Sequence, residues 1–263
     1  MRGKEGAMDA TVHIEFADRF ATITLCNPAK RNALSLDVLH QLIDAFTTVG
    51  QSDTRGVILA AEGPVFSAGH NFGDMYQASQ SDAQQLFTVC SYLMKLMHNI
   101  PQPIIAKVHA LATAAGCQLV ATCDLAVAAR SAGFALPGGK GGLFCHTPLV
   151  AVARSLPPKR ALEMALTGDV VSAETAYEWG LINSVVDDTQ LDEAVLDLLQ
   201  RATRGSVESK ALGKKTYYEQ VGMDVSAAYE FASAVMADAA VSDVAQMGIQ
   251  AFLEKRHPDF GDR

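Results

Sequence analysis

Two short turns in this chain carry the residues best suited to bind and polarise a ligand. The first is Phe66-Ser67-Ala68-Gly69-His70-Asn71, and the second is Ala112-Thr113-Ala114-Ala115-Gly116-Cys117-Gln118. Both follow apolar, strand-like runs, and the second leads into an apolar, helix-like run. Small residues at such junctions let a ligand approach the main chain, where unpaired N–H groups at a helix start stabilise a developing negative charge. The two turns therefore predict an oxyanion hole.

Other kinds of site fit the sequence poorly. The five cysteines are an odd number without the paired spacing of a metal knuckle, so we expect reduced core thiols and no metal. The seven histidines form no HExxH pattern, and no GxSxG elbow is present. The glycine-rich run at 138–142 resembles a phosphate loop, but no Gly-Lys-Ser/Thr element follows it at a helix start.

The composition bounds the possible functions. A chain of 263 residues can form one large α/β domain, with or without a helical extension. Its 49% apolar and 19% charged residues are typical of globular proteins. Because no apolar run reaches membrane-spanning length and no signal-peptide pattern is seen, we expect a soluble, cytoplasmic protein with no membrane partner. The net charge of -8 offers no basic field for nucleic acid, so an anionic ligand would need a local cluster such as Lys30 and Arg31.

The elements that must position the two turns alternate between strand and helix in the first half of the chain. Alternating apolar residues at 12–16 and 21–25 predict an antiparallel hairpin. Apolar runs at 57–61, 104–108 and 125–128 predict buried strands. Helical spacing follows Ser35, a possible N-cap, and a buried helix is expected at 116–122. Ser81-Asp82-Ala83-Gln84 has the signature of a capping box that opens a further helix, which ends before Pro101.

Strand patterns nearly vanish after about residue 146, apart from 182–186. Helical patterns are predicted at 149–155, 158–166, 173–179, 191–202, 207–218, 226–238 and 243–255. No linker separates the two halves, and Met8 could be the native start because residues 1–7 show no structural pattern. We therefore expect an α/β core at 1–199 followed by a helical region at 200–263.

The chain resembles the crotonase, or enoyl-CoA hydratase/isomerase, superfamily over nearly its whole length. Besides the two turns, the resemblance rests on Asn27-Pro28-Ala29-Lys30-Arg31-Asn32-Ala33-Leu34, Cys123-Asp124-Leu125-Ala126-Val127-Ala128, Phe134-Ala135-Leu136-Pro137, Leu166-Thr167-Gly168 and Ala251-Phe252-Leu253-Glu254-Lys255-Arg256. It implies a spiral of ββα units with a C-terminal helical region that builds trimers, often paired into hexamers.

The resemblance also implies a ligand and the residues that hold it. In the family, the thioester carbonyl of an acyl-CoA accepts two backbone N–H bonds, and by position these donors fall here at His70 and Ala115. CoA enters as part of the substrate, so no separate cofactor is implied. The implied CoA contacts are Ala29, Lys30, Arg31, Ser67 and Ala68, together with Phe252 and Lys255, which in relatives reach the CoA of a neighbouring subunit. We expect the acyl tail among Phe72, Met75, Leu93, Met94 and Phe144.

The acid–base groups of the resembled hydratases are missing. Their two glutamates fall on Gln118 and Gly138, so neither position can titrate. Each such group contributes about two to four orders of magnitude in rate, so we expect ordinary hydration to be severely impaired. Some relatives place a catalytic aspartate about eight residues beyond the second glutamate position, which is His146 here.

His146 is therefore the candidate substitute acid or base, with Cys145 a less favoured nucleophile. Alternatively, His146 fills space or bonds to main chain at a helix start. Asp74, near the first turn, fits a helix-start charge better than a base.

Three interpretations follow from these residues. The chain is an acyl-CoA enzyme with non-standard acid–base groups, a protein of the same fold that binds acyl-CoA without turning it over, or a structural oligomer. The last leaves Lys30, Arg31 and the two turns unexplained.

Overall fold

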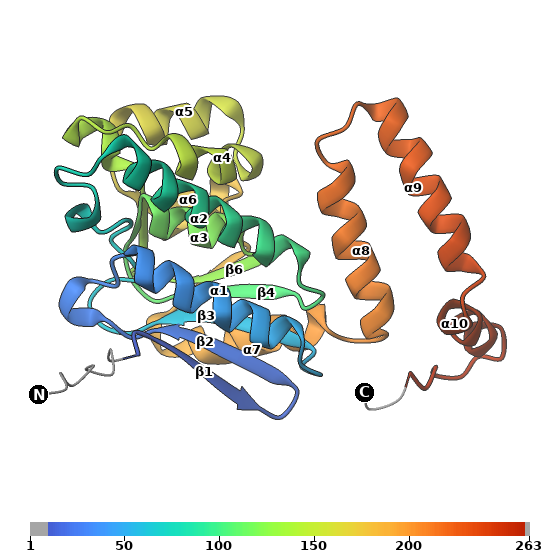
Figure 1. Ribbon diagram of the computed structural model, residues 1–263. Coiled ribbons are helices and arrows are strands. Elements are labelled where there is room, and N and C mark those ends of the chain that lie inside the picture. The colour runs from blue at the N-terminus through green and yellow to red at the C-terminus, as the bar shows by residue number, and fades with distance from the viewer. Residues whose placement is uncertain (1–9, 261–263) are drawn as a thin grey trace, which may run out of the picture.

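Two β-sheets form the centre of the protein, and helices cover them (Figure 1). The computed structural model describes residues 10–260, so Met8 lies outside the described residues. The larger sheet has the strand order β1-β2-β3-β4-β6-β9. Its strands are β1 (Val12–Ala17), β2 (Phe20–Leu25), β3 (Gly56–Ala61), β4 (Ile104–Val108), β6 (Leu125–Ala129) and β9 (Ser184–Val186). The smaller sheet contains β5 (Ala112–Thr113), β7 (Gly133–Ala135) and β8 (Val171–Ser172).

The strand pairing follows the sequence pattern. β1 and β2 form the expected antiparallel hairpin, whereas β2, β3, β4, β6 and β9 pair in parallel. In this register Ile23 lies opposite Leu59, and both side chains are fully buried. A parallel sheet covered on both faces requires apolar runs of this kind.

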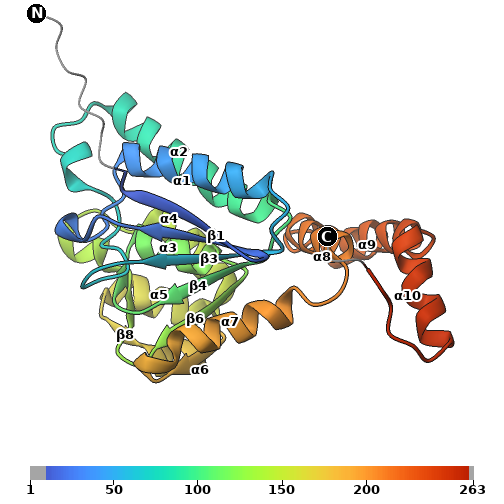
Figure 2. The same cartoon turned by 90° about the horizontal axis from the view of Figure 1, so that it is seen from below.

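Helices α1 (Leu36–Gly50) and α2 (Gln80–Asn99) lie side by side over one face of the larger sheet (Figure 2). The N-cap of α1 is Ser35, as expected, and its hydroxyl accepts a hydrogen bond from Val38 N at 3.2 Å. The predicted start of α2 was wrong. Its capping box joins Ser79 to Asp82, each side chain accepting from the other's main-chain N–H. Ser79 rather than Ser81 is therefore the cap, because the helix begins one turn ahead of the first apolar position.

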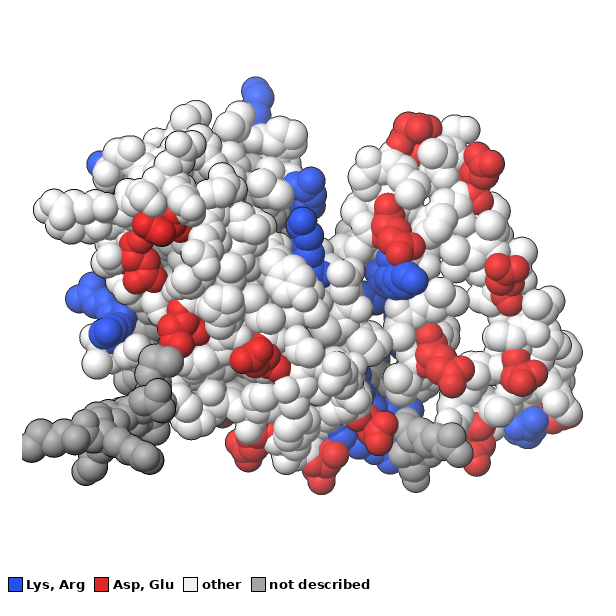
Figure 3. Space-filling model, in the orientation of Figure 1, with Lys and Arg blue, Asp and Glu red and all other residues white. Residues whose placement is uncertain are grey.

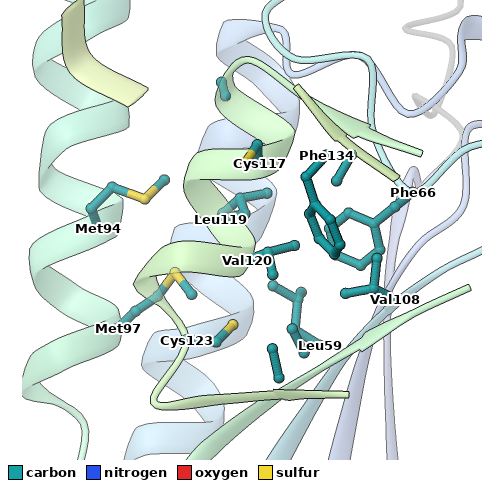
Figure 4. Close-up of a cluster of buried hydrophobic side chains, with 14 of the residues drawn as sticks. Leu59, Phe66, Met94, Met97, Val108, Cys117, Leu119, Val120, Cys123 and Phe134 are labelled. Atoms are coloured by element: carbon teal, nitrogen blue, oxygen red, sulfur yellow. The ribbon is translucent and has the colours of Figure 1, made fainter. Parts of the chain in front are cut away.

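Helix α3 (Ala115–Thr122) is enclosed in the core. Figure 4 shows Cys117, Leu119 and Val120 directed from α3 into the core, with the methionines of α2 on one side. On the other side lie the rings of Phe66 and Phe134. The second turn thus has a rigid helix directly behind it, which fixes the position of its main chain.

The second half of the core is helical. It contains α4 (His146–Ser155), α5 (Pro158–Thr167), α6 (Ala173–Trp179) and α7 (Leu191–Ala202). α7 covers the sheet face opposite α1 and α2 (Figure 2), where Val195 and Leu199 pack on Ile105 and Val127. The predicted division at residue 199 falls inside α7, and the chain leaves the core only after Ala202.

The last three helices form an arm that stands away from the core (Figures 1 and 2). They are α8 (Val207–Gln220), α9 (Val225–Ala240) and α10 (Asp243–Leu253), and we call them the C-terminal arm. In the structure of this chain alone, α8 and α9 contain no buried residue. Within residues 10–260, no helix is both long and apolar enough to cross a membrane.

Candidate functional site

The two turns lie next to each other in the structure. Phe66 N donates to Leu111 O, and Thr113 N donates to Ser67 O, both at 2.9 Å. On its other side, the first turn is bridged to Leu34, whose N–H donates to Gly69 O at 2.8 Å. The first turn is therefore held between the segment at Leu34 and the second turn.

These bonds fix where two main-chain N–H groups point. The C=O and N–H of a trans peptide point in opposite directions. Because Gly69 O faces Leu34, the N–H of His70 is directed away from Leu34, toward the second turn. Ala114 O accepts from Gln118 N inside α3, so the N–H of Ala115 points out of the N-terminus of that helix. No side chain caps α3, which leaves its first N–H groups available at this end.

Two glycines allow the turns to come this close. A Cβ at Gly69 would lie 2.8 Å from Ala114 Cβ and 3.1 Å from Ala115 N. A Cβ at Gly116 would lie 2.5 Å from Ser67 O and 2.7 Å from Ser67 Cβ. At each position the shortest of these contacts is below 3.0 Å, which real Cβ atoms essentially never show, so only glycine fits at either position. The separation of the His70 and Ala115 main chains is therefore set by the packing of one turn on the other.

Ala114, directly before α3, has a strained backbone. Its φ of 49° and ψ of -118° lie in a region that L-residues rarely adopt. This conformation joins β5 to α3 and turns the Ala114 peptide so that Ala114 N donates to Ala135 O at 2.9 Å. The strain is thus located at the residue that orients the Ala115 N–H.

The turns border a cavity of about 480 Å³. Its wall is mainly apolar and aromatic, and it comes from the first turn, the segment after it, α2 and the loop before α4. Ala68, His70, Ala114, Phe144, Gly138 and His146 all contribute to it. Of the residues expected around an acyl tail, Phe72, Met75 and Phe144 line the cavity, whereas Leu93 and Met94 lie in the core.

Gln118 is buried behind the second turn. Its side chain is 3% exposed, and its Oε1 accepts a long contact of 3.9 Å from the thiol of Cys90. Burial raises the pKa of Cys90 to about 12, so this thiol keeps its proton at neutral pH. Neither group can therefore take a proton from a ligand.

Gly138 lies in a loop that folds back on itself. Gly138 O accepts from Leu143 N at 3.0 Å, and Gly138 N donates to Cys145 Sγ at 3.3 Å. A Cβ at this position would collide with Leu143 O and lie 2.8 Å from Cys145 Sγ. The loop therefore excludes any side chain at the place where the resembled hydratases have a carboxylate.

His146 is the first residue of α4, and its exposed ring lies on the cavity wall, 5.2 Å from the ring of Phe144. The main-chain N–H of His146 donates to Phe144 O at 2.8 Å. Cys145 also lines the cavity, and burial raises the pKa of its thiol, which disfavours a nucleophilic thiolate. Asp74 accepts hydrogen bonds from Leu36 N at 2.9 Å and from Asn71 Nδ2 at 3.0 Å, so it supports the start of α1.

The residues expected to contact CoA fall in three places. Ala29, Lys30 and Arg31 are exposed on and beside a short 3-10 helix, and Ala68 is exposed at the cavity. Ser67 is fully buried, and its hydroxyl donates to Asn32 O at 2.8 Å, so its side chain supports the turn from inside. Phe252 and Lys255 lie at the end of the C-terminal arm, far from the cavity of the same chain (Figure 1).

The sequence predicts no acid–base role for the side chain of His70, because no local pattern indicates what surrounds its ring. The ring lines the cavity, its Nδ1 lies 3.4 Å from Leu34 O, and it meets Phe87 edge to face at 5.4 Å. Burial lowers the pKa of His70, although Leu34 O and Asp74 oppose this shift. In the described part of the chain, no group of three or more His, Cys, Asp or Glu side chains could hold a metal ion.

Comparisons with known proteins identify the family of this chain. The family model for enoyl-CoA hydratase/isomerase matches residues 15–263. Enoyl-CoA hydratase domain-containing protein 3, mitochondrial, from Rattus norvegicus is 45% identical over 243 residues, which cover 92% of this chain and 81% of the relative. Crotonyl-CoA hydratase from Syntrophomonas wolfei is 27% identical over 253 residues, 94% of this chain and 96% of that protein.

Solved structures show the same fold. The crystal structure of an enoyl-CoA hydratase from Mycobacterium smegmatis superposes with a TM-score of 0.93 at 40% identity, covering 96% of this chain and 99% of that one. The human enoyl Coenzyme A hydratase domain-containing protein 3 gives a TM-score of 0.91 at 41% identity, covering 95% and 99%. The chain belongs to the enoyl-CoA hydratase/isomerase family and has the crotonase fold.

Proposed function

We propose that this protein binds acyl-CoA thioesters and polarises the thioester carbonyl with the main-chain N–H groups of His70 and Ala115. The observation that carries the proposal is the interlocking of the two turns, which directs both N–H groups to the edge of an apolar cavity. Backbone donors do not depend on side-chain identity, so His and Ala serve here as well as other residues. One such donor is worth about 2.7 to 4 kcal/mol of barrier in a comparable acyl-transfer site.

The CoA moiety would lie along the first turn and the short 3-10 helix. Lys30 and Arg31 are exposed there, with Ala29 beside them, and offer positive charge to phosphate groups in a chain whose net charge is -8. Ala68 would contact the pantetheine portion where it enters the cavity. Ser67 would contribute through its main chain, since its side chain is buried.

The reaction differs from ordinary hydration in this proposal. Gln118 has no titratable proton, and Gly138 has no room for a side chain. His146 lines the cavity and is the acid–base residue that the sequence predicts. A protein that binds acyl-CoA without turning it over is the second candidate, and the loss of both carboxylate positions favours it.

We also propose that the protein assembles into a homotrimer or a hexamer. Large apolar side chains of the C-terminal arm are exposed in the single chain, among them Tyr229, Met236 and Phe252. Figure 3 shows uncharged surface between scattered acidic residues on the arm. Phe252 and Lys255 lie too far from the cavity of their own chain to serve it, so they would reach a CoA bound to a neighbouring subunit. Sedimentation velocity tests this assembly, and a single monomeric species at micromolar concentration would contradict it.

The cellular location remains a prediction. The sequence favours a cytoplasmic protein, whereas the relative from Rattus norvegicus is mitochondrial by name. Fractionation of the source cells tests this point.

Calorimetric titration with CoA, hexanoyl-CoA and crotonyl-CoA tests the binding proposal. We expect both acyl-CoAs to bind, and the Lys30→Ala, Arg31→Ala double variant to bind at least about tenfold more weakly, because two phosphate partners are removed. Lys159→Ala, a change at an exposed lysine of α5, is the matched control and should bind normally. No affinity for any of the three ligands would refute the proposal.

Turnover is measured in the same samples. We expect hydration of crotonyl-CoA at least about 100-fold slower than in hydratases that keep both glutamates. A rate within tenfold of such enzymes would show that the missing carboxylates are not needed.

A further inference from the structure

His70 presents a titratable ring at the cavity, next to its own main-chain N–H. This position matters because the residues at the two usual acid–base positions, Gln118 and Gly138, cannot transfer a proton. The ring is only partly exposed, and it is held between the segment at Leu34 and the α2 residue Phe87. His70 therefore brings a potential proton carrier to the place where the thioester carbonyl would be bound.

The surroundings of the ring determine its tautomer. Leu34 O is a carbonyl oxygen and can only accept, so the proton of the neutral ring belongs on Nδ1, which lies 3.4 Å away. The lone pair is then on Nε2. A backbone carbonyl that orients one nitrogen while the other acts is the usual arrangement of a histidine base.

Nε2 is buried and has no hydrogen-bond partner within residues 10–260. Leaving a buried polar atom unpaired is energetically unfavourable, so such an atom needs an explanation. Phe87 offers Nε2 no hydrogen bond, and the Nδ1 contact with Leu34 O, at 3.4 Å, is longer than the usual range of about 2.7 to 3.2 Å. The terminal torsion of a histidine side chain is broad, so a small rotation of the ring that keeps Nδ1 near Leu34 O can bring Nε2 to a ligand in the cavity.

We propose that Nε2 of His70 removes and returns the proton on the carbon adjacent to the thioester carbonyl of an acyl-CoA in this cavity. The inference rests on the proposed function, since it needs the carbonyl to be held by the two main-chain N–H groups. In the step, the C–H bond breaks and its electron pair forms the enolate, whose oxygen is stabilised by His70 N and Ala115 N. The proton passes to Nε2, giving an imidazolium, and its return to carbon restores the starting state without another reactant.

The charged neighbours of the ring support this role. Burial lowers the pKa of His70, so the ring is neutral and able to accept a proton at pH 7. Asp74, from the segment between the first turn and α2, favours the imidazolium once it forms. Cys145 and His146 are the other titratable residues that line the cavity, and Cys90 lies about one turn along α2 from Phe87.

Hydrogen–deuterium exchange at the α-carbon of hexanoyl-CoA in D2O, followed by mass spectrometry, tests the step directly. The wild-type protein should exchange this position, with a rate that rises with pH and levels off at a lower pH than an ordinary histidine base would give, because burial lowers the pKa of His70. His70→Gln and His70→Phe should each lower the rate at least about 100-fold. Both should bind hexanoyl-CoA within about tenfold of wild type, because the main-chain N–H remains. His13→Gln, at an exposed position of β1, is the control and should exchange normally.

The outcomes separate the two proposals. Failure of the wild type to bind hexanoyl-CoA would refute the proposed function itself. Binding without exchange between pH 5 and 9 would refute only the role of His70. Exchange that survives in both His70 variants but is lost in His146→Gln would assign the base to His146 and overturn the inference.

Discussion

At the scale of single residues, Ala114 combines an unfavourable conformation with a position next to a ligand-facing N–H. A non-glycine residue in such a region costs about 1 to 3 kcal/mol. The bridge between Ser67 and Ala112, and the bond from Ala114 N to Ala135 O, hold the residue in place. The fold thus tolerates strain at Ala114, where it orients the Ala115 N–H.

Ala114→Gly should therefore stabilise the protein. Glycine adopts positive φ readily, and this gain exceeds its extra chain entropy of about 0.5 to 1 kcal/mol. We expect the free energy of unfolding, measured by urea titration, to rise by about 1 kcal/mol. Ala153→Gly, at an exposed position of α4, is the control and should lower it by up to about 1 kcal/mol. A loss of stability in Ala114→Gly would contradict the backbone assignment.

A substitution at Gly138 should have the opposite effect and lower the free energy of unfolding. Gly138→Ala should lower the free energy of unfolding by about 1 to 3 kcal/mol, because the new methyl group meets Leu143 O and Cys145 Sγ. Gly141→Ala is the matched control, since a Cβ there has no atom within 4 Å, and should be near neutral. Gly138→Glu should not restore hydration. Equal stability of the two alanine variants would show that the loop opens easily.

The sequence predicts main-chain features of the site better than side-chain contacts. Small residues after apolar runs were enough to place the two turns, because backbone geometry follows from residue size. The inward hydroxyl of Ser67 and the orientation of the His70 ring depend on Asn32 and Leu34, which lie 35 and 36 positions away in the chain. Such contacts exist only after folding, so no local pattern indicates them.

At the scale of elements, one buried ion pair fixes the C-terminal arm to the core. Lys214 of α8 lies 2.8 Å from Asp124, and the two side chains are only 8% and 16% exposed. Lys214 also donates to Met97 O and Gln102 O, and the hydroxyl of Tyr218 donates to Asp124 at 2.8 Å. Every partner of Lys214 belongs to the core, so this residue decides where α8 attaches.

Lys214→Met should detach the start of the arm and destabilise the protein. Removing one partner leaves Asp124 buried without its counter-charge, which costs about 3 to 5 kcal/mol. We expect a lower urea midpoint and faster proteolysis at 203–206.

Lys215→Met is the control, because its pair with Glu219 is exposed and is worth at most about 1 kcal/mol. The Lys214→Met, Asp124→Leu double variant should be more stable than Lys214→Met alone, and an equal loss in both would point to a cause other than the unpaired carboxylate.

Long elements were predictable from the sequence, and short ones were not. α7 has the predicted bounds, because apolar spacing continues over its several turns. The strands of the smaller sheet are two or three residues long, too short for any alternation to show. The cap of α2 was misplaced because Ser79 and Ser81 both precede the helical pattern, and only the bonds to Asp82 distinguish them.

At the scale of the whole molecule, two histidines couple stability to pH. Burial lowers the pKa of His70 and also that of His98, whose ring stacks on Tyr218 at 3.7 Å. Lys214 and Arg154 lower the pKa of His98 further, while Asp124 and Thr122 O oppose them. The unfolded chain therefore takes up protons near pH 6.5 that the folded protein resists.

Stability should thus be greatest above about pH 6.5 and fall as the pH is lowered through the folded-state pKa values. Urea midpoints measured between pH 8 and 5 test this, and His98→Gln should reduce the slope. His13→Gln, which changes an exposed residue, should leave the slope unchanged. A wild-type midpoint that rises on acidification would contradict the assignment.

The loop at Gly138 also limits how this protein can change over evolutionary time. A single substitution to glutamate meets Leu143 O before the carboxylate can reach any ligand. Segment 143–145 would have to move first, and that movement alone confers no hydration activity. The order of mutations is thereby constrained, because a glutamate at Gly138 becomes compatible with the fold only after this segment has moved. Under the proposed function, side chains such as those of His70 and His146 can therefore change far more readily than a carboxylate can be introduced at Gly138.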